Sequence, residues 1–126
     1  MTAADTSTWI AFLQGESGDD VQMLAKALGD RQVVMVPPVL TELLSDPALS
    51  ASVARTLSDL PLIEIGPGYW HRAGRLRAGV LAQHRKARFG DALIAQSCID
   101  GGVSLITRDR DLRAFVDGAG LKLISG

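Results

Sequence analysis

The residues best suited to chemistry are four carboxylates that lie far apart in the chain: Asp5, Glu42, Asp91 and Asp109. Each falls where a predicted strand ends or where a predicted helix begins. In an open α/β sheet, the residues just beyond the carboxyl ends of parallel strands converge on one crevice, and ligands bind there. Carboxylates gathered in such a crevice repel one another unless protons or a cation neutralise them. The pattern therefore predicts an acidic pocket that holds a metal ion, as in a metal-dependent enzyme.

The elements that would position these carboxylates alternate between strand and helix. Apolar and β-branched runs predict strands at 32–36, 62–65, 103–107 and 121–124, after a first short strand at 2–4. Helical spacing and capping residues predict two helices that begin near residues 6 and 19, and a third helix at 39–44. A fourth helix follows Pro47 and ends near residue 58. Further helices are predicted at 69–86, at 91–100 and at 112–117, the last of them capped by Asp111. This order predicts a single α/β domain over residues 1–126. We expect three α/β/α layers with a mostly parallel central sheet of about five short strands.

The composition is that of a compact globular protein. Of the 126 residues, 47% are hydrophobic and 21% are charged, which excludes a disordered chain. No apolar run approaches the ~20 residues that a membrane-spanning helix needs, and the N-terminus has no leader-like segment. We therefore expect a cytoplasmic protein with no membrane partner. The single cysteine, Cys98, has the spacing of a buried helix face and is expected to be an inert core thiol.

The charged residues are unevenly distributed along the chain. A net charge of −1 excludes a protein that coats nucleic acid over its whole surface. Between Ile65 and Gly90, however, there is no acid, and this basic segment runs directly into Asp91. A basic ridge beside an acidic pocket suits a phosphodiester substrate, although a helix with arginines is also commonly just a solvated face. The basic residues of the segment are Arg72, Arg75, Arg77, Arg85, Lys86 and Arg88.

Four blocks of the sequence carry the acidic quartet: Asp5–Ile10, Val36–Leu44, Asp91–Ala95 and Leu105–Leu112. In order and content they resemble the four blocks of PIN domains and, more narrowly, those of VapC-type toxins of bacterial toxin–antitoxin pairs. The likeness covers essentially the whole chain, and the combination of blocks makes it specific. It implies a PIN-like fold and an endoribonuclease that uses Mg²⁺ or Mn²⁺. It also implies a homodimeric toxin that acts on RNA and is held inactive by a small VapB-like antitoxin.

The resemblance also assigns roles to individual residues. The family's acids fall on the quartet, and the expected polar support comes from Ser7 and Thr107. We expect Asp5 and Asp91 to contact the metal directly, while Glu42 and Asp109 orient water or position a second ion. Asp111 is a competing candidate for the fourth acid of the quartet. Ala4 stands where such proteins usually have a large apolar residue, directly before the first acid, Asp5. The residues expected to contact RNA phosphates are Arg75, Arg85, Lys86 and Arg88.

Each acid also has a simpler interpretation. Asp91 could cap a helix, Glu42 could lie on a solvated face, and Asp5 and Asp109 could be turn residues. The acids outside the quartet are expected at turns, caps or exposed helix ends, among them Glu16, Asp19, Asp20, Asp30, Asp46, Asp59, Asp100 and Asp117.

Two other small α/β enzyme classes fit the sequence badly. A response-regulator receiver would need an aspartate after the strand at 62–65, and a phosphatase of the haloacid dehalogenase type would need an acid in place of Ser7. The alternative function that the sequence leaves open is a catalytically silent PIN-like module that binds RNA or a protein partner.

Overall fold

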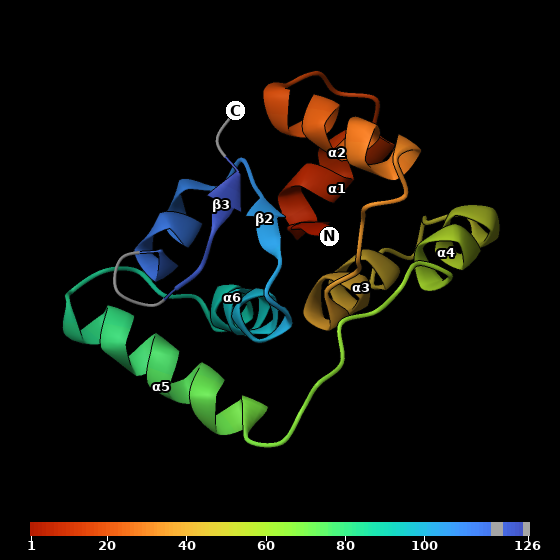
Figure 1. Ribbon diagram of the computed structural model, residues 1–126. Helices are drawn as coiled ribbons and strands as arrows, with labels where there is room; N and C mark the ends of the chain where they lie inside the picture. The colour runs from red at the N-terminus through yellow and green to blue at the C-terminus, as the bar shows by residue number, and fades with distance from the viewer. Residues whose placement is uncertain (117–119, 125–126) are drawn as a thin grey trace.

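The computed structural model describes residues 1–116 and 120–124 (Figure 1). Its central sheet is parallel and consists of β1 (Thr2–Ala4), β2 (Ser104–Ile106) and β3 (Leu123–Ile124), in the order β1-β2-β3. Ala4 aligns with Ile106 across the first pair of strands. This register brings the carboxyl ends of β1 and β2 to one edge of the sheet, so Asp5 and Thr107 follow their strands at neighbouring positions.

Two extended segments continue the sheet beyond β1. The segment predicted as a strand at 32–36 pairs in parallel with β1 and with the segment predicted as a strand at 62–65, over a single bridge in each case. These bridges join Thr2 to Val33 and Met35 to Leu62. The pairing is short because Pro37 and Pro61 flank the two segments, and a proline has no N–H to donate to a neighbouring strand. The predicted α/β fold with a mostly parallel sheet is confirmed.

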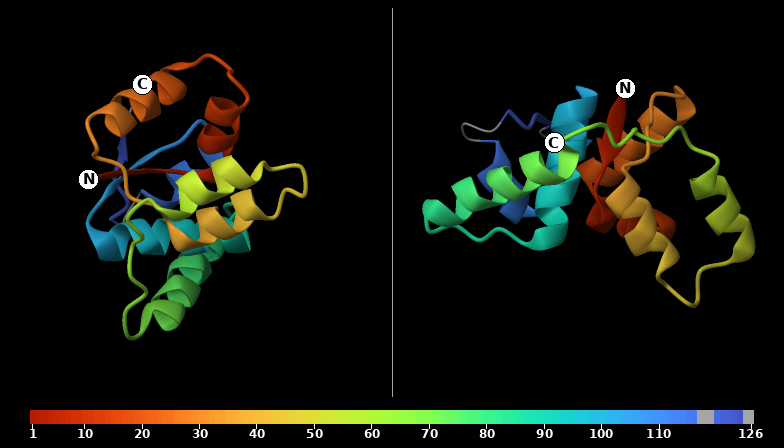
Figure 2. Two further views of the ribbon diagram at one scale, coloured as in Figure 1. Left: turned by 90° about the vertical axis from the view of Figure 1, so that its right-hand side faces the viewer. Right: turned by 90° about the horizontal axis from the view of Figure 1, so that it is seen from below.

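Helices cover both faces of the sheet (Figures 1 and 2). α1 (Thr6–Leu13) and α2 (Asp19–Gly29) lie on one side of β1, whereas α6 (Phe89–Gly101) lies on the other, with α5 (Tyr69–Ala82) beyond it. α3 (Pro37–Leu44) contacts both α1 and α6, and α4 (Ala51–Ser58) packs against α3. A short 3₁₀ helix, η1 (Arg110–Phe115), follows β2.

Several helix ends differ from the predicted ones. α3 begins at Pro37, because proline suits the first turn of a helix, where an N–H would have no helical partner. α5 ends at Ala82 and not near 86, since His84 has a positive φ of 59° that a right-handed helix does not contain. η1 ends at Phe115, and the predicted helix end at 117 lies outside the described residues. The basic residues at 85–88 therefore belong to the connection between α5 and α6, and not to a long helix.

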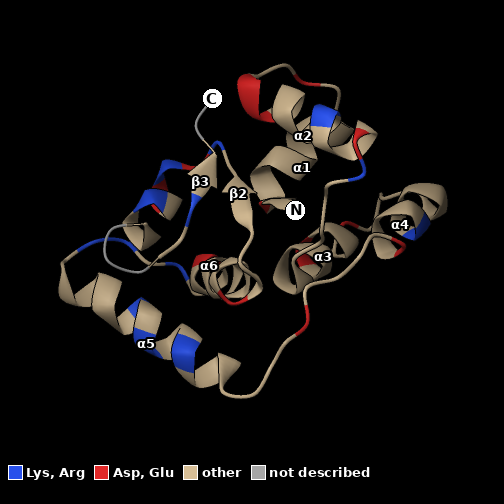
Figure 3. Cartoon of the chain, viewed as in Figure 1, with Lys and Arg blue, Asp and Glu red and all other residues tan. Residues whose placement is uncertain are grey.

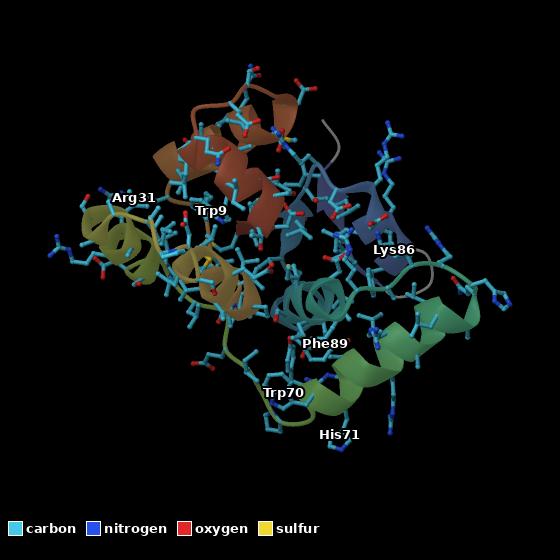
Figure 4. All side chains as sticks on the ribbon, turned by 180° about the vertical axis from the view of Figure 1, so that it is seen from behind. Trp9, Arg31, Trp70, His71, Lys86 and Phe89 are labelled. Atoms are coloured by element: carbon cyan, nitrogen blue, oxygen red, sulfur yellow. The ribbon has the colours of Figure 1, made fainter. Side chains whose placement is uncertain are left out.

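The core lies between the sheet and the helices. Ala3 and Ala4 are fully buried, so small side chains let helices approach β1 closely from both faces, although alanine is not typical of strands. Trp9 is buried on the α1 side (Figure 4). Burial raises the pKa of the Cys98 thiol to about 12, which agrees with the prediction of an inert core residue. Within the described residues, no helix is both long enough and apolar enough to cross a bilayer.

Candidate active site

Three hydrogen bonds hold Asp5 at the end of β1. One carboxylate oxygen, Oδ1, accepts from the Thr8 amide at 3.0 Å, which makes Asp5 the N-cap of α1, and from the Ser7 hydroxyl at 2.9 Å. The other oxygen, Oδ2, accepts from the Thr107 hydroxyl. Asp5 is only 3% exposed, and this burial raises its pKa, while the donors, Thr107 foremost, oppose the rise. The donors fix the orientation of the carboxylate and favour its ionised form.

The segment after β2 brings Asp109 to the same edge of the sheet. The Thr107 hydroxyl, which donates to Asp5, also accepts from the Asp109 amide at 2.9 Å. Oδ1 of Asp109 accepts from the Asp111 amide at 2.9 Å, so Asp109 is the N-cap of η1. The prediction that Asp111 caps this helix is therefore wrong. Oδ2 of Asp111 instead pairs with two cations, Lys86 at 3.3 Å and Arg88 at 3.7 Å.

Asp91 lies in the first turn of α6, close to these acids. The helix begins at Phe89, earlier than predicted, and its N-cap is Arg88, so Asp91 does not cap it. Burial raises the pKa of Asp91 to about 6, and the charges of Asp109, Asp5 and Asp111 add to the rise, which Arg88 opposes. Its Oδ2 atom is buried and has no hydrogen-bond partner among the described residues. A buried carboxylate oxygen without a partner, next to other acids, indicates a place for a cation.

Glu42 lies at the edge of this cluster. Its side chain is exposed on α3, and Oε1 accepts from the Thr6 hydroxyl at 2.9 Å. A Cβ atom on Gly90 would lie 4.0 Å from the same oxygen, so the carboxylate reaches the start of α6, next to Asp91. The structure thus brings Asp5, Asp91 and Asp109 near one another and places Glu42 beside them.

The donor set suits a hard divalent cation that few side chains contact directly. Within the described part of the chain, no three Asp, Glu, His or Cys side chains lie close enough together to hold a metal ion jointly. Mg²⁺ prefers oxygen ligands in near-octahedral geometry and keeps several of its waters, so one or two direct carboxylates are enough. The unpartnered Oδ2 of Asp91 has the chemistry that such a direct ligand needs. The residues present therefore fit a magnesium or manganese ion that retains most of its water.

The family of the chain is evident from its sequence as a whole. Residues 3–117 of the chain match the PIN domain family. The chain is a member of the PIN domain family. The resemblance to PIN domains noted from the four acidic blocks is thereby confirmed. No curated protein is detectably similar in sequence.

Solved structures share the fold of this PIN domain over nearly its whole length. VapBC-5 of Mycobacterium tuberculosis, from a toxin–antitoxin family, is 19% identical, with a TM-score of 0.70 and coverage of 99% of this chain and 98% of that one. VapBC2 of Rickettsia felis, bound to promoter DNA, is 20% identical, with a TM-score of 0.73 and coverage of 98% and 96%. FitAcB of Neisseria gonorrhoeae is 14% identical, with a TM-score of 0.69 and coverage of 99% and 97%. At these identities the likeness establishes the fold alone.

Two arginines of the basic segment are engaged inside the PIN domain. Arg72 forms two bonds to the Asp100 carboxylate, the shorter at 2.6 Å, and Arg77 donates to the Ala87 carbonyl at 2.9 Å. They hold α5 to α6 and to the connection before it, and so have a structural use.

Most of the other basic residues of the segment lie in the connection between α5 and α6 (Figure 3). Lys86 lies beside η1, where it and Arg88 pair with Asp111 (Figure 4). Arg85 is in the same connection, and Arg75 is exposed on α5. Three of the four predicted RNA contacts are thus in the connection that leads into the first turn of α6, which carries Asp91.

Sequence reasoning missed an ion pair next to the site. Asp20, expected at an exposed helix end, is only 8% exposed, and its Oδ2 lies 2.8 Å from Nε of Arg108. Arg108 stands between Thr107 and Asp109 in the sequence, and this adjacency is the one local signal that could have drawn attention to it. Nothing in the sequence near Asp20 indicates a partner 88 residues away.

Proposed function

We propose that this PIN domain is a metal-dependent endoribonuclease and the toxin of a type II toxin–antitoxin pair. The observation that carries the proposal is the state of Asp91, whose buried Oδ2 has no partner and whose pKa is raised to about 6 by burial and by neighbouring acids. A carboxylate without a partner is costly to maintain unless a ligand offsets the cost. A divalent cation is the simplest such ligand.

We assign direct metal contact to Asp5 and Asp91, with Glu42 and Asp109 acting through water or at a second ion. A bound Mg²⁺ or Mn²⁺ would activate water and neutralise charge on the phosphate oxygens. The chain's own part is to hold the carboxylates ready. Ser7, Thr8 and Thr107 donate to Asp5, which orients its carboxylate and favours its ionised form against the effect of burial. The cap on η1 fixes Asp109 in the same way, since one of its oxygens is bound to the Asp111 amide.

RNA would approach along the basic connection between α5 and α6. Arg75, Arg85, Lys86 and Arg88 are assigned to its phosphates, which gives affinity without sequence readout. Lys86 and Arg88 pair with Asp111 at exposed positions, where ion pairs contribute little to stability. Such pairs can be exchanged for RNA phosphates at small cost.

The proposed partners rest on the similarity of the fold to solved structures. The similar solved structures include VapBC toxin–antitoxin complexes, and this supports a small VapB-like antitoxin as the partner of this chain. A homodimer acting on cytoplasmic RNA is part of the same proposal. The alternative is a catalytically silent module that binds RNA or protein. It would be favoured by the finding that, among the described residues, no three Asp, Glu, His or Cys side chains lie close enough together to hold a metal ion jointly.

The test is RNA cleavage and growth inhibition by Asp5→Asn and Asp91→Asn, with Asp59→Asn at the exposed end of α4 as the matched control. Each site variant removes a charge at the proposed metal position and should lower cleavage at least about hundredfold, whereas the control should match the parent. Undiminished cleavage by both site variants would show that the site is elsewhere. RNA binding by the parent without any cleavage would establish the silent module.

A further inference from the structure

A second network of hydrogen bonds lies directly behind the candidate active site. The Arg108 guanidinium binds the Asp20 carboxylate through two bonds, Nε to Oδ2 at 2.8 Å and Nη2 to Oδ1 at 3.1 Å. The same Oδ2 accepts from the Thr8 hydroxyl at 2.9 Å. Arg108 lowers the pKa of Asp20, which is therefore ionised at neutral pH. A paired, hydrogen-bonded carboxylate of this kind joins the start of α2 to the segment that follows β2.

The network closes into a ring that contains one candidate catalytic carboxylate, Asp5, and that is linked to a second, Asp109. Thr8 donates its hydroxyl to Asp20 and its amide to Asp5. The Asp5 carboxylate accepts a hydrogen bond from the Thr107 hydroxyl. Arg108, the next residue in the chain, donates to the Asp20 carboxylate and so closes the ring. Asp109 is tied to the ring through its amide, which donates to the Thr107 hydroxyl. A displacement of the 107–109 segment would therefore move both the donor to Asp5 and the backbone of Asp109.

We propose that Asp20 and Arg108 are positioning residues of this PIN domain, which hold the 107–109 segment against α1 and so set the geometry of the Asp5 and Asp109 carboxylates. Neither residue donates to or accepts from Asp91 or Glu42 in the contacts of the described residues, so their action passes through Thr8 and Thr107. The consequence for catalysis rests on the proposed function. The placement of the two carboxylates does not, and can be measured without it.

The chain offers a matched control for an ion pair that only stabilises the fold. Arg72 binds Asp100 through two bonds, at 3.2 and 2.6 Å, and also donates to the Pro67 carbonyl at 2.8 Å. Arg108 likewise binds one carboxylate through two bonds and one carbonyl, that of Ser17 at 3.3 Å, and it also forms a longer ion pair with Glu16 at 3.8 Å. The Arg72 pair joins α5 to α6, and none of its hydrogen bonds leads to the acids of the site.

The first experiment compares Arg108→Gln with Arg72→Gln by amide hydrogen exchange in the metal-free protein. The amides of Thr8 and Asp109 donate only to side-chain oxygens of the ring, so they report its geometry. In Arg108→Gln both should exchange at least about tenfold faster than in the parent, and in Arg72→Gln both should keep the parental rate. Parental rates at both amides in folded Arg108→Gln would overturn the proposal. If that variant does not fold, Asp20→Asn, which keeps the side-chain shape, is judged by the same criterion.

The second experiment measures RNA cleavage by the same variants. Misplaced carboxylates should lower kcat about ten- to hundredfold with little change in KM, and Arg108→Lys should recover part of the loss. Arg72→Gln should retain the parental kcat. An increase in KM at unchanged kcat would mean that Arg108 binds RNA directly, and would overturn the positioning role. If the parent does not cleave RNA, the proposed function fails, and the exchange rates still decide whether the ring positions Asp5 and Asp109.

Discussion

Asp91→Asn should make the metal-free protein more stable at neutral pH, although it removes a residue proposed to be essential for activity. The pKa of Asp91 is raised from 3.8 to about 6, first by burial and then by the charge of Asp109. Each tenfold change in proton affinity corresponds to about 1.4 kcal/mol, so ionising Asp91 costs the folded state up to about 3 kcal/mol. Solvent reaches this half-buried carboxyl and screens it, which leaves about 1–2 kcal/mol. The asparagine variant does not incur this cost.

The sign of the pH dependence follows from the raised pKa. The folded protein holds the Asp91 proton more tightly than the unfolded chain does, so this carboxyl costs no stability below pH 3.8. The cost grows as the pH rises from 3.8 to about 6 and is constant above that value. The advantage of Asp91→Asn should therefore be largest at neutral pH and should shrink towards pH ~4.

The assay is thermal unfolding in chelator, followed by circular dichroism at neutral pH and near pH ~4.5. A gain of about 1–2 kcal/mol corresponds to an increase in melting temperature of about 3–8 °C for a chain of this size. Asp111→Asn is the control, because it also removes a charge near Asp91 but loses the pairs with Lys86 and Arg88, and it should gain little or nothing. A lower melting temperature for Asp91→Asn at neutral pH would refute the reasoning, and a gain independent of pH would show that packing, and not charge, is responsible.

Two further predictions concern the fourth acid and the basic connection. Asp109→Asn should lower kcat/KM for RNA cleavage far more than Asp111→Asn, because Asp109 perturbs Asp91 more strongly and is tied to Thr107; the opposite order would make Asp111 the fourth acid. Replacing Arg85, Lys86 and Arg88 with serine should weaken RNA binding across sequences and reduce the salt slope by ~0.7 for each lost phosphate contact. Filter binding over a range of salt concentrations measures this, and an unchanged slope would assign these residues to a solvated or partner-binding surface.

The sequence predicts those features that local patterns determine. The acids of the quartet could be placed because each adjoins a change of element, and α2 could be placed because its apolar residues recur at helical spacing. The end of α5 could not be placed, because histidine as a residue type does not indicate the positive φ that His84 adopts. The same limit applies to Asp109, which caps η1 where Asp111 was expected.

The contacts of Asp20 with distant segments could not be predicted from the sequence. Asp20 has the local sequence of an exposed helix start, and only the fold brings Thr8 and Arg108 to it. Asp20 is thereby buried beside a charged partner and becomes part of the hydrogen-bonded ring that adjoins the site. Residues of this kind are found from the structure, because their partners are set by the packing of elements and not by spacing along the chain.

The central claim is that this PIN domain hydrolyses RNA with a divalent cation held at Asp5 and Asp91. The measurement that tests it most directly is cleavage of single-stranded RNA by the purified protein in Mg²⁺, in Mn²⁺ and in chelator, with analysis of the fragment ends. The account predicts cleavage with either metal, none in chelator, and fragments without a 2′,3′-cyclic phosphate, because water and not the ribose hydroxyl is the nucleophile. Equal cleavage in chelator, or fragments that end in a cyclic phosphate, would contradict it.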